Sequence, residues 1–382
     1  MLIDRLNNIE DIINLQEKFY KENGMYPLNV SNWTVSDIFR KEMESLFRHN
    51  MTNSPIDYLY SYNISSEVKN KVMQKLGVSE SNISSKTCTF FPSNSLSIIN
   101  VCNLLQKIQC KKIGILYPAY FSISACLNTY GLKTIPFYIT RKQQKYFIPI
   151  EDILRKKPDA LWITSPIYST GVSYDHNNID IIEKILQLGI QVILDESFCI
   201  KGQELIRKFS KYKNFISIYS PHKAISFNSY KFSSIICEDC YEDLLDQWLD
   251  VFCGNLPQTS IAAINHYLSD NYDICYQGFQ NFIKHAYDRV ISVLHRFSNI
   301  DFDYITYGNL MTIYIKNLDY TKSQSMDFLL DVLNNTYALY YPGYLNGFAK
   351  SMGFCFRINL ALYNSEFIAS FERLLAYLCQ NL

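Results

Sequence analysis

The amino-acid sequence predicts an α/β protein, and two observations carry this prediction. Between about residue 86 and residue 240, short apolar runs alternate with longer stretches whose apolar positions recur with the period of a helix. After about residue 241 this alternation stops, and long amphipathic stretches precede two short apolar runs and a last helix. Strands that are separated by helices form right-handed crossovers and a mostly parallel sheet covered by helices on both faces.

The elements of the alternating region follow in order. The expected strands are 87–91, 111–118, 133–139, 159–166, 191–197, 214–220 and 232–237. The expected helices are 95–108, 121–131 and 178–189. Together they form the mostly parallel central sheet with its helical cover.

The last third of the chain predicts a smaller α+β unit. Its expected helices are 241–253, 260–270, 281–297 and 365–382, and its expected strands are 309–317 and 353–362. We expect an N-terminal segment (residues 1–50) that packs with this small domain, a large α/β domain (51–250) and the small domain itself (251–382).

Composition excludes several function classes. The chain of 382 residues has 36 Lys and Arg against 36 Asp and Glu, so no global positive field attracts nucleic acid or an anionic membrane. No uncharged apolar run reaches the roughly 20 residues that a membrane span needs. The N-terminus mixes charged with apolar residues, which a signal peptide does not tolerate. We therefore expect a cytoplasmic protein with no nucleic-acid or membrane partner.

The numbers of cysteines and glycines affect how sequence motifs are interpreted. The 11 cysteines are scattered through apolar contexts, which is typical of reduced, buried thiols. Cys237 and Cys240 form a single CxxC without a second pair, which is weak evidence for a metal, and we predict none. With only 13 glycines, motifs usually written with glycine are expected here with Ser, Asn or Pro instead.

Chemistry-bearing residues follow several of the expected strands. Ligands of open parallel sheets bind beyond the carboxyl ends of the strands, so these positions are candidate site residues. Each residue also has an ordinary structural interpretation when taken singly, such as a helix cap or a core aromatic residue. The candidates are Ser93, Asn94, Ser95, Tyr120, Tyr168 in the loop 165–171, Asp195, Phe198, Ser220, Lys223 and Lys231.

In order and spacing, these residues resemble the signals of the pyridoxal phosphate-dependent aminotransferases of fold type I, class I/II. The resemblance covers roughly residues 58–362. It rests on the small-residue segment Ser93-Asn94-Ser95, Pro118-Ala-Tyr120, Ser165-Pro-Ile-Tyr168-Ser-Thr-Gly171, Asp195-Glu-Ser-Phe198, Ser220-Pro-His-Lys223, Lys231, Pro342-Gly343 and Arg357.

The resemblance implies a role for each matched residue. Lys223 corresponds to the lysine that forms a Schiff base with pyridoxal 5'-phosphate and then shuttles a proton. Asp195 corresponds to the partner of the pyridine nitrogen, and Tyr120 to the residue that stacks on the ring. Arg357 corresponds to the arginine that forks onto the substrate α-carboxylate. The phosphate group would be held by Ser93, Asn94, Ser95, Ser220 and Lys231.

Tyr60 falls roughly where the family places a tyrosine that reaches the phosphate group of the neighbouring subunit, although Tyr58 and Tyr62 are equally available. The resemblance also implies a homodimer with active sites at the subunit interface. The N-terminal segment around Trp33 has aromatic residues and few charges, which disfavours a dedicated site for a second carboxylate.

The sequence departs from the family at the residues around the phenolic oxygen of the cofactor. Tyr168 stands where the family has an Asn, and Phe198 stands where it usually has a Tyr. Lys231 replaces the phosphate-binding Arg and keeps the charge but not the bidentate fork. Hydrogen-bond donors to the phenolic oxygen influence the pKa of the imine between Lys223 and the cofactor. We therefore expect this pKa to be changed, unless the Tyr168 hydroxyl takes over the role of the missing donors. We expect His222 to be structural, because its neighbour Lys223 points the other way along an extended chain.

Three functional hypotheses remain at this point. The first is an aminotransferase that passes the amino group of an amino acid to a 2-oxo acid. The second keeps the cofactor but catalyses elimination, cyclisation, oxidation or a condensation of the α-oxoamine synthase type. The third is a non-catalytic scaffold, which the presence of Lys223, Asp195 and Arg357 disfavours because such groups are costly to bury without a ligand.

Overall fold

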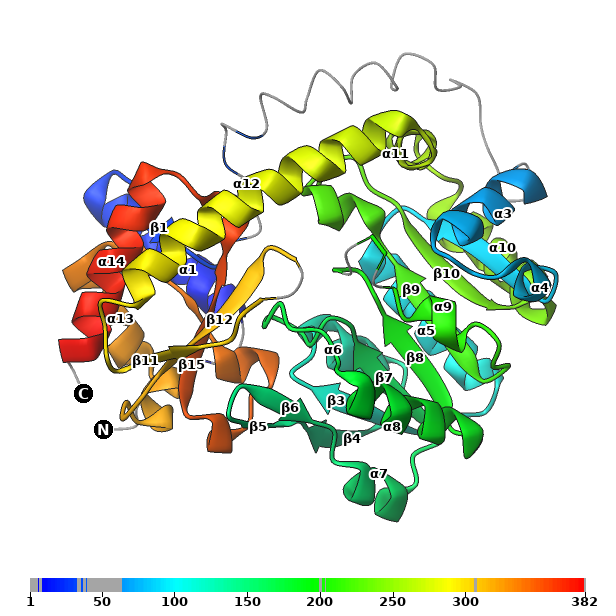
Figure 1. The fold of residues 1–382 in the computed structure, drawn as a ribbon, viewed down its shortest axis with the longest axis horizontal. Coiled ribbons are helices and arrows are strands. Elements are labelled where there is room, and N and C mark those ends of the chain that lie inside the picture. Colours follow the sequence, from blue (N-terminus) through cyan, green and yellow to red (C-terminus); the bar gives the residue numbers. More distant parts are fainter. Residues whose placement is uncertain are drawn as a thin grey trace.

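The computed structural model describes Leu6, residues 9–32, Ser36, Phe39 and residues 64–198, 201–202, 204–305 and 308–380. Tyr60 with its neighbours Tyr58 and Tyr62, and Trp33, lie outside the described residues. Figure 1 shows the described chain as two lobes joined by the long helix α12 (Asp270–Leu294).

The larger lobe is built on a seven-stranded sheet in the order β2-β10-β9-β8-β7-β3-β4. Its strands are β2 (Lys86–Phe91), β3 (Lys112–Tyr117), β4 (Lys133–Tyr138), β7 (Ala160–Thr164), β8 (Gln191–Asp195), β9 (Phe215–Tyr219) and β10 (Ser233–Glu238). β10 runs antiparallel to both of its neighbours, and the other neighbouring pairs are parallel. The predicted mostly parallel sheet is therefore confirmed.

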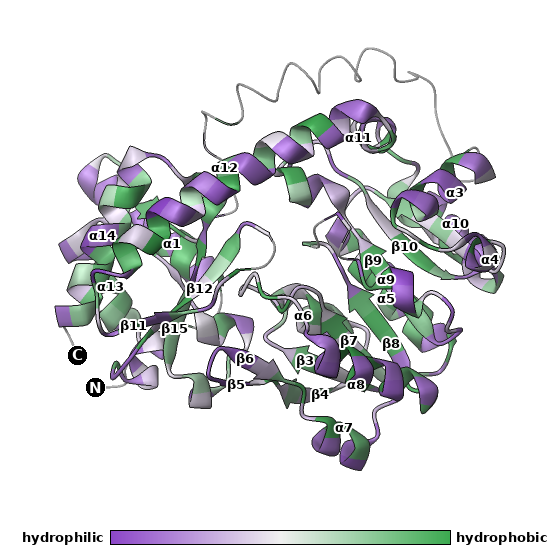
Figure 2. Ribbon diagram, in the orientation of Figure 1, coloured by the Kyte–Doolittle hydropathy of each residue, from purple (hydrophilic) through white to green (hydrophobic). Residues whose placement is uncertain are grey.

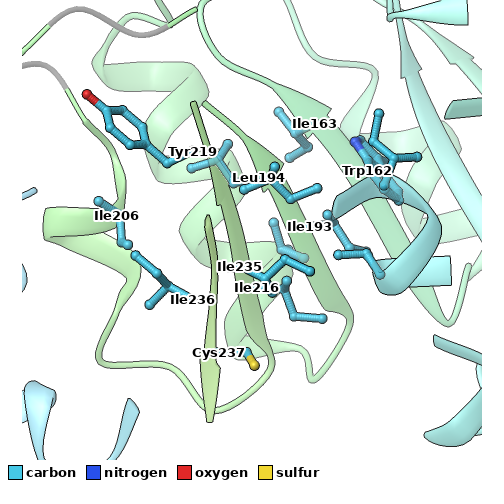
Figure 3. Packing of buried hydrophobic residues seen from close by; sticks show 14 of the residues in the cluster. Trp162, Ile163, Ile193, Leu194, Ile206, Ile216, Tyr219, Ile235, Ile236 and Cys237 are labelled. Carbon is cyan, nitrogen blue, oxygen red and sulfur yellow. The ribbon is translucent and has the colours of Figure 1, made fainter. Parts of the chain in front are cut away.

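Helices cover this sheet. They are α3 (Ser66–Lys75), α4 (Glu80–Ile83), α5 (Asn94–Lys107), α6 (Phe121–Thr129), α7 (Ile150–Lys156), α8 (His176–Gln187), α9 (Ile206–Phe209), α10 (Glu242–Cys253) and α11 (Gln258–Leu268). Figure 2 shows hydrophobic residues along the strands and hydrophilic residues on exposed helix surfaces. In Figure 3 the buried side chains of β7, β8, β9 and β10, among them Trp162, Leu194 and Ile216, pack into one core.

The smaller lobe has an antiparallel sheet in the order β11-β12-β15-β14. Its strands are β11 (Ile300–Phe302), β12 (Leu310–Ile315), β15 (Phe354–Asn359) and β14 (Tyr341–Pro342). Beside it lie α13 (Met326–Thr336), α14 (Ser365–Gln380) and the N-terminal helix α1 (Ile9–Asn23), and the short strand β1 (Leu28–Asn29) pairs with β13 (Ala338–Leu339).

The two lobes have separate hydrophobic cores, and α12 contributes to both. Tyr272 and Cys275 pack in the core of the large lobe, whereas Phe279, Ile283 and Val290 pack in that of the small lobe. Residues of α11 also belong to the core of the large lobe, although the sequence analysis assigned residues 251–270 to the small domain. Within the described residues, no helix is long and apolar enough to cross a membrane.

A hairpin that the sequence analysis did not anticipate links the lobes. It consists of β5 (Thr140–Lys142) and β6 (Lys145–Phe147). Arg141 on this hairpin forms ion pairs with Asp301 (2.8 Å) and Asp303 (2.7 Å) of the small lobe. The guanidinium also lies 4.1 Å from the centre of the Tyr314 ring, so these contacts hold the hairpin against β11 and β12.

The sheet topology explains why residues far apart in sequence meet at one edge. The carboxyl ends of the parallel strands β3, β7, β8 and β9 point the same way. β2 has the same direction as β9 because both are antiparallel to β10, and the amino end of β10 therefore lies at this edge as well. The segments after β2, β3, β8 and β9 and the segment before β10 are thus gathered there.

Candidate active site

A pocket with a volume of about 230 Å³ lies at this edge. It brings together residues from the segments after β2, β3, β8 and β9, from the segment before β10, and from the amino end of β12. Its lining residues are Ser93, Asn94, Ser95, Tyr120, Phe198, His222, Lys223, Ser226, Asn228, Lys231 and Asn309. The sequence analysis singled out seven of these as binding residues, and their functional roles stay predictions.

One end of the pocket favours an anion. Ser93 is the N-cap of α5, with extended backbone, and its side chain accepts a hydrogen bond from the Leu96 backbone N–H (3.3 Å). The backbone N–H groups of the first helical turn and the positive end of the helix dipole therefore face this region. The hydroxyl-bearing Ser95 and the exposed lysine Lys231 also line the pocket. Such a combination of helix terminus, hydroxyl and cation suits a phosphate group.

Asp195 ends β8 as a buried carboxylate, with 2% of its surface exposed. The Ser197 backbone N–H donates to its Oδ1 (3.1 Å), so the turn after β8 supports the carboxylate. Asn94 lies close by, because its Oδ1 accepts hydrogen bonds from the Ser197 hydroxyl (2.8 Å) and from the Ser220 hydroxyl (3.4 Å). These bonds join the segments after β2, β8 and β9 into one wall.

Lys223 lies on the short helix η2 (Pro221–Ile225), directly after β9. Its Nζ is 4.3 Å from the centre of the Phe198 ring and 5.9 Å from the centre of the Tyr120 ring. Burial lowers the pKa of Lys223 from its ordinary 10.5 to about 8, and the charges of Lys231 and Arg357 add to this effect, whereas Asp195 opposes it. Among the described residues, Nζ has no carboxylate within ion-pairing distance. The amine therefore loses its proton at about pH 8 instead of above pH 10.

Aromatic rings lie next to this amine: Tyr120 and Phe198 line the pocket, whereas Tyr168 lines a small cavity that shares Phe198 with it. The centres of the Tyr120 and Tyr168 rings are 6.0 Å apart, and those of Tyr168 and Phe198 are 6.5 Å apart. Such side chains suit a flat aromatic ligand, because aromatic rings attract one another in offset-stacked or edge-to-face arrangements.

Arg357 lies in β15 and is almost fully buried, with 1% of its surface exposed. Its Nη1 donates to the Tyr168 hydroxyl oxygen (3.1 Å), and its Nη2 donates to the Ser31 carbonyl (3.2 Å). The guanidinium also stacks over the Tyr341 ring, with its Cζ 4.8 Å from the ring centre. Arg357 is therefore behind the Tyr168 side chain rather than on the pocket wall.

Several pocket residues were not singled out from the sequence as binding residues. Asn309 directly precedes β12 and donates from Nδ2 to Asn359 Oδ1 (2.6 Å). Ser226 and Asn228 lie between Lys223 and Lys231 in the sequence. No local pattern distinguishes an Asn of this kind from a turn residue, so only the three-dimensional contacts reveal it.

His222 also lines the pocket, and its Nδ1 lies 3.0 Å from the Phe232 carbonyl. Burial lowers the pKa of His222 to about 3, so the ring is neutral.

Glu196, next to Asp195, fastens the loop that follows β8. Its carboxylate oxygens accept from the backbone N–H groups of Leu205 (2.6 Å) and Ile206 (3.1 Å). Burial raises the pKa of Glu196 to about 8.

Cys237 is buried and Cys240 is exposed, and the described residues contain no group of three or more His, Cys, Asp or Glu side chains arranged to hold a metal ion.

The fold is shared with solved aminotransferases, although no family model and no curated protein sequence matches the chain. An alanine aminotransferase from Pyrococcus furiosus superimposes with a TM-score of 0.77 at 16% identity, covering 97% of each chain. A methionine aminotransferase from Escherichia coli, YbdL, gives a TM-score of 0.76 at 10% identity, covering 95% of this chain and 96% of that one.

A pyridoxal phosphate-bound C–S lyase from Staphylococcus hominis gives a TM-score of 0.68 at 16% identity, covering 90% of this chain and 85% of that one. At these identities the likeness establishes the fold. The fold-type I architecture expected from the sequence is thereby confirmed.

Proposed function

We propose that this protein is a pyridoxal phosphate-dependent enzyme that acts on an amino acid, and that it is an aminotransferase. One observation carries the proposal: a half-buried lysine, Lys223, whose pKa is lowered to about 8, lies at the wall of the pocket where the strands of an aminotransferase fold end. A lysine with a lowered pKa is the group that attaches to a cofactor aldehyde.

The residues of the pocket fit this cofactor. Its phosphate group suits the amino end of α5 with Ser95 and Lys231, and its flat ring suits the wall that contains Tyr120. The buried Asp195 supplies a negative charge, which keeps a pyridine nitrogen protonated. When bound, pyridoxal phosphate draws electrons away from the Cα of an amino acid and so stabilises negative charge there.

The chain's own residues then provide binding and proton transfer. The Lys223 amine would take a proton from the substrate Cα and return it, and its pKa of about 8 in the protein suits a group that exchanges a proton. Asp195 and Asn94 keep their places through the Ser197 hydrogen bonds, so the polar wall is fixed in advance of binding. The resemblance of the sequence supports Arg357 as the cation for the substrate carboxylate, although its guanidinium lies behind the Tyr168 side chain and not on the pocket wall.

A second candidate function keeps the cofactor but changes the outcome. Phe198 offers no hydroxyl next to Lys223, where the family usually has a tyrosine, and one protein of similar fold is described as a C–S lyase. A β-elimination would release the substituent on Cβ and, after hydrolysis, ammonia and a 2-oxo acid, whereas a transamination would pass the amino group to a second 2-oxo acid.

Analysis of the half-reaction tests the proposal and separates these candidates. The cofactor-loaded protein is mixed with a panel of amino acids without any 2-oxo acid, and the cofactor and products are then identified. An aminotransferase leaves pyridoxamine phosphate in an amount equal to the enzyme, and a 2-oxo acid restores the original cofactor. Continuous release of ammonia with unchanged cofactor supports the lyase and contradicts transamination.

The assembly and the location follow from the same proposal. We propose a homodimer in the cytoplasm, with the active sites at the subunit interface, and a tyrosine near position 60 that contributes to the neighbouring site. We also propose that the large and small domains meet within α12, because its first part packs in one core and its remainder in the other. Sedimentation of the purified protein tests the dimer.

A further inference from the structure

Asn309 is a buried polar residue that the small lobe contributes to the pocket. It directly precedes β12 and is 5% exposed. It lines both the main pocket and a smaller cavity of about 10 Å³. Phe198 lines the same two cavities, and its ring centre is 4.3 Å from the Lys223 amine. Asn309 therefore lies on the side of the pocket that contains this ring.

The orientation of the Asn309 carboxamide is fixed by Asn359. The Oδ1 atom of Asn359 accepts from the Ala361 backbone N–H (3.0 Å), and its Nδ2 donates to the Asn32 carbonyl (2.8 Å). These backbone partners determine which atom of the Asn359 carboxamide is the oxygen. Because this oxygen also lies 2.6 Å from the Asn309 carboxamide, Asn309 must present its nitrogen to it. The Asn309 oxygen is thus left for another partner.

This oxygen lacks a donor. In the part of the chain that the structure describes, no side chain or backbone group donates a hydrogen bond to Asn309 Oδ1. A buried acceptor that is left unpaired is unfavourable, and native structures rarely contain one. Because Asn309 lines the pocket, a molecule bound there can supply the missing donor.

The charges and the size of the pocket restrict what this molecule carries. Lys231 and Arg357 both lower the pKa of Lys223, so their positive charges act on this pocket. They repel a cationic donor such as an ammonium group. A carboxylate has no proton to donate and would leave the Asn309 oxygen unpaired. The volume of about 230 Å³ is below the roughly 300–1,000 Å³ of usual ligand pockets, which favours a compact molecule.

We propose that Asn309 is a specificity-determining residue whose side-chain oxygen accepts a hydrogen bond from the substrate side chain, and that this side chain is compact and uncharged and carries a hydroxyl or carboxamide donor. The inference rests on the proposed function and names the class of its substrate. Serine, threonine, asparagine and glutamine belong to this class. A site of this kind discriminates against an apolar side chain of the same shape, because that side chain leaves the buried acceptor unpaired.

The experiment measures binding, with carboxylates that lack the amino group and therefore form no covalent adduct with the cofactor. Isothermal titration calorimetry compares succinamate with 4-methylpentanoate, and each enantiomer of 3-hydroxybutanoate with 3-methylbutanoate. The members of each pair match in shape, and only the first carries a donor. Succinate is added as a probe whose side chain is anionic and donates no proton.

The cofactor-loaded wild type is compared with Asn309→Leu, which removes the acceptor, and with Asn309→Asp, which keeps an acceptor at the same place. Asn346→Leu is the matched control. Asn346 is a buried asparagine of the small lobe, 1% exposed, and is not among the described residues that line the pocket. If N309L does not fold, Asn309→Ala replaces it, because alanine removes the acceptor without adding bulk.

We expect the wild type and N346L to bind a donor probe roughly tenfold more tightly than its apolar partner, which corresponds to about one hydrogen bond. N309L should lose this preference and N309D should keep it, and succinate should bind the wild type more weakly than succinamate. Equal affinities within every pair, an unchanged preference in N309L, or a preference for succinate would each overturn the inference and leave the proposed function standing. A wild type that takes up no pyridoxal phosphate contradicts the proposed function, and the inference with it.

Discussion

The Lys223 amine lies 4.3 Å from the centre of the Phe198 ring, so the amine on η2 faces an apolar ring across the pocket. Burial is the largest cause that lowers the pKa of Lys223 and so keeps the lysine uncharged at a lower pH than usual. Phe198, which stands where the aminotransferase pattern usually has a tyrosine, is therefore a direct neighbour of the lysine that we propose to bind the cofactor.

The substitution Phe198→Tyr is expected to lower the pKa of the visible absorption band of the bound cofactor by about one unit. The added hydroxyl supplies a donor close to Lys223, and a hydrogen bond to the deprotonated form favours that form by about 1 kcal/mol. A pH titration of the absorbance measures the shift. Phe121→Tyr is the matched control, because Phe121 is 41% exposed and adjacent to Tyr120 but outside the pocket lining. Equal titration curves for F198Y and the wild type would contradict the assigned position of Phe198.

Replacing Lys223 by Met is expected to stabilise the cofactor-free protein at neutral pH. The folded-state pKa of Lys223 is about 8 and its ordinary value is 10.5, so the protonated form is disfavoured by folding. The resulting penalty is fully present below pH 8, decreases as the pH rises, and has vanished above pH 10.5. Lys223→Met removes a penalty of about 2–3 kcal/mol at pH 7.

Urea unfolding of the wild type and K223M at pH 7 and at pH 9.5 measures this effect. The difference in the free energy of unfolding between the two proteins should shrink at the higher pH. A difference that is independent of pH would show that the lysine has an ordinary pKa in the folded protein.

The contact between the hairpin β5–β6 and the small lobe predicts strong coupling between Arg141 and Asp303. Their side chains are 11% and 3% exposed, and breaking a buried pair leaves an uncompensated charge. We expect Arg141→Met and Asp303→Asn each to destabilise the protein by about 3 kcal/mol, and the double variant to lose much less than the sum. Chemical unfolding of the four proteins of this cycle gives the coupling energy. Additive losses would contradict the pairing.

Gly347 is expected to tolerate no side chain. Its φ of +80° is in the left-handed region, and a Cβ there would lie 2.1 Å from Cδ1 of Tyr117. Gly347→Ala should therefore lower the free energy of unfolding by about 2–4 kcal/mol, from backbone strain and from displacement of the ring. Gly131→Ala is the control, because Gly131 has a similar φ of +67° but a Cβ added there would meet no atom within 4 Å. The control should cost about 1 kcal/mol. Equal losses for the two variants would mean that the close approach to Tyr117 has no cost.

Much of the fold and the pocket could be predicted from the sequence, for a physical reason. Strands buried on both faces leave an apolar run that local composition reveals, and a parallel sheet places the residues after its strands at one edge. This is why Tyr120, Phe198 and Lys223, which follow three different strands, line one pocket. Lys231 precedes β10. Because β10 is antiparallel to β9, its amino end lies at the same edge of the sheet, and Lys231 therefore lines the same pocket.

The features that the sequence analysis missed depend on contacts between distant segments. Arg357 is held by Tyr168 and by Ser31, which is 326 residues away in the sequence, and no local pattern encodes that contact. The expected helix 281–297 begins earlier, at Asp270, because the extended backbone of Ser269 separates it from α11 by a single residue. The expected N-terminal tyrosine, Tyr60, lies outside the described residues and stays a prediction.

The most direct test of the proposed function is the visible absorption spectrum of the purified protein after incubation with pyridoxal phosphate and removal of the excess. Lys223→Ala is compared with Lys284→Ala, which removes an exposed lysine on α12. We predict a visible band in the wild type and in K284A, its absence in K223A, and its bleaching by at least one amino acid of a panel. A wild type that remains colourless, or a K223A protein with an unchanged band, would contradict the assignment of Lys223 and with it the proposed enzyme.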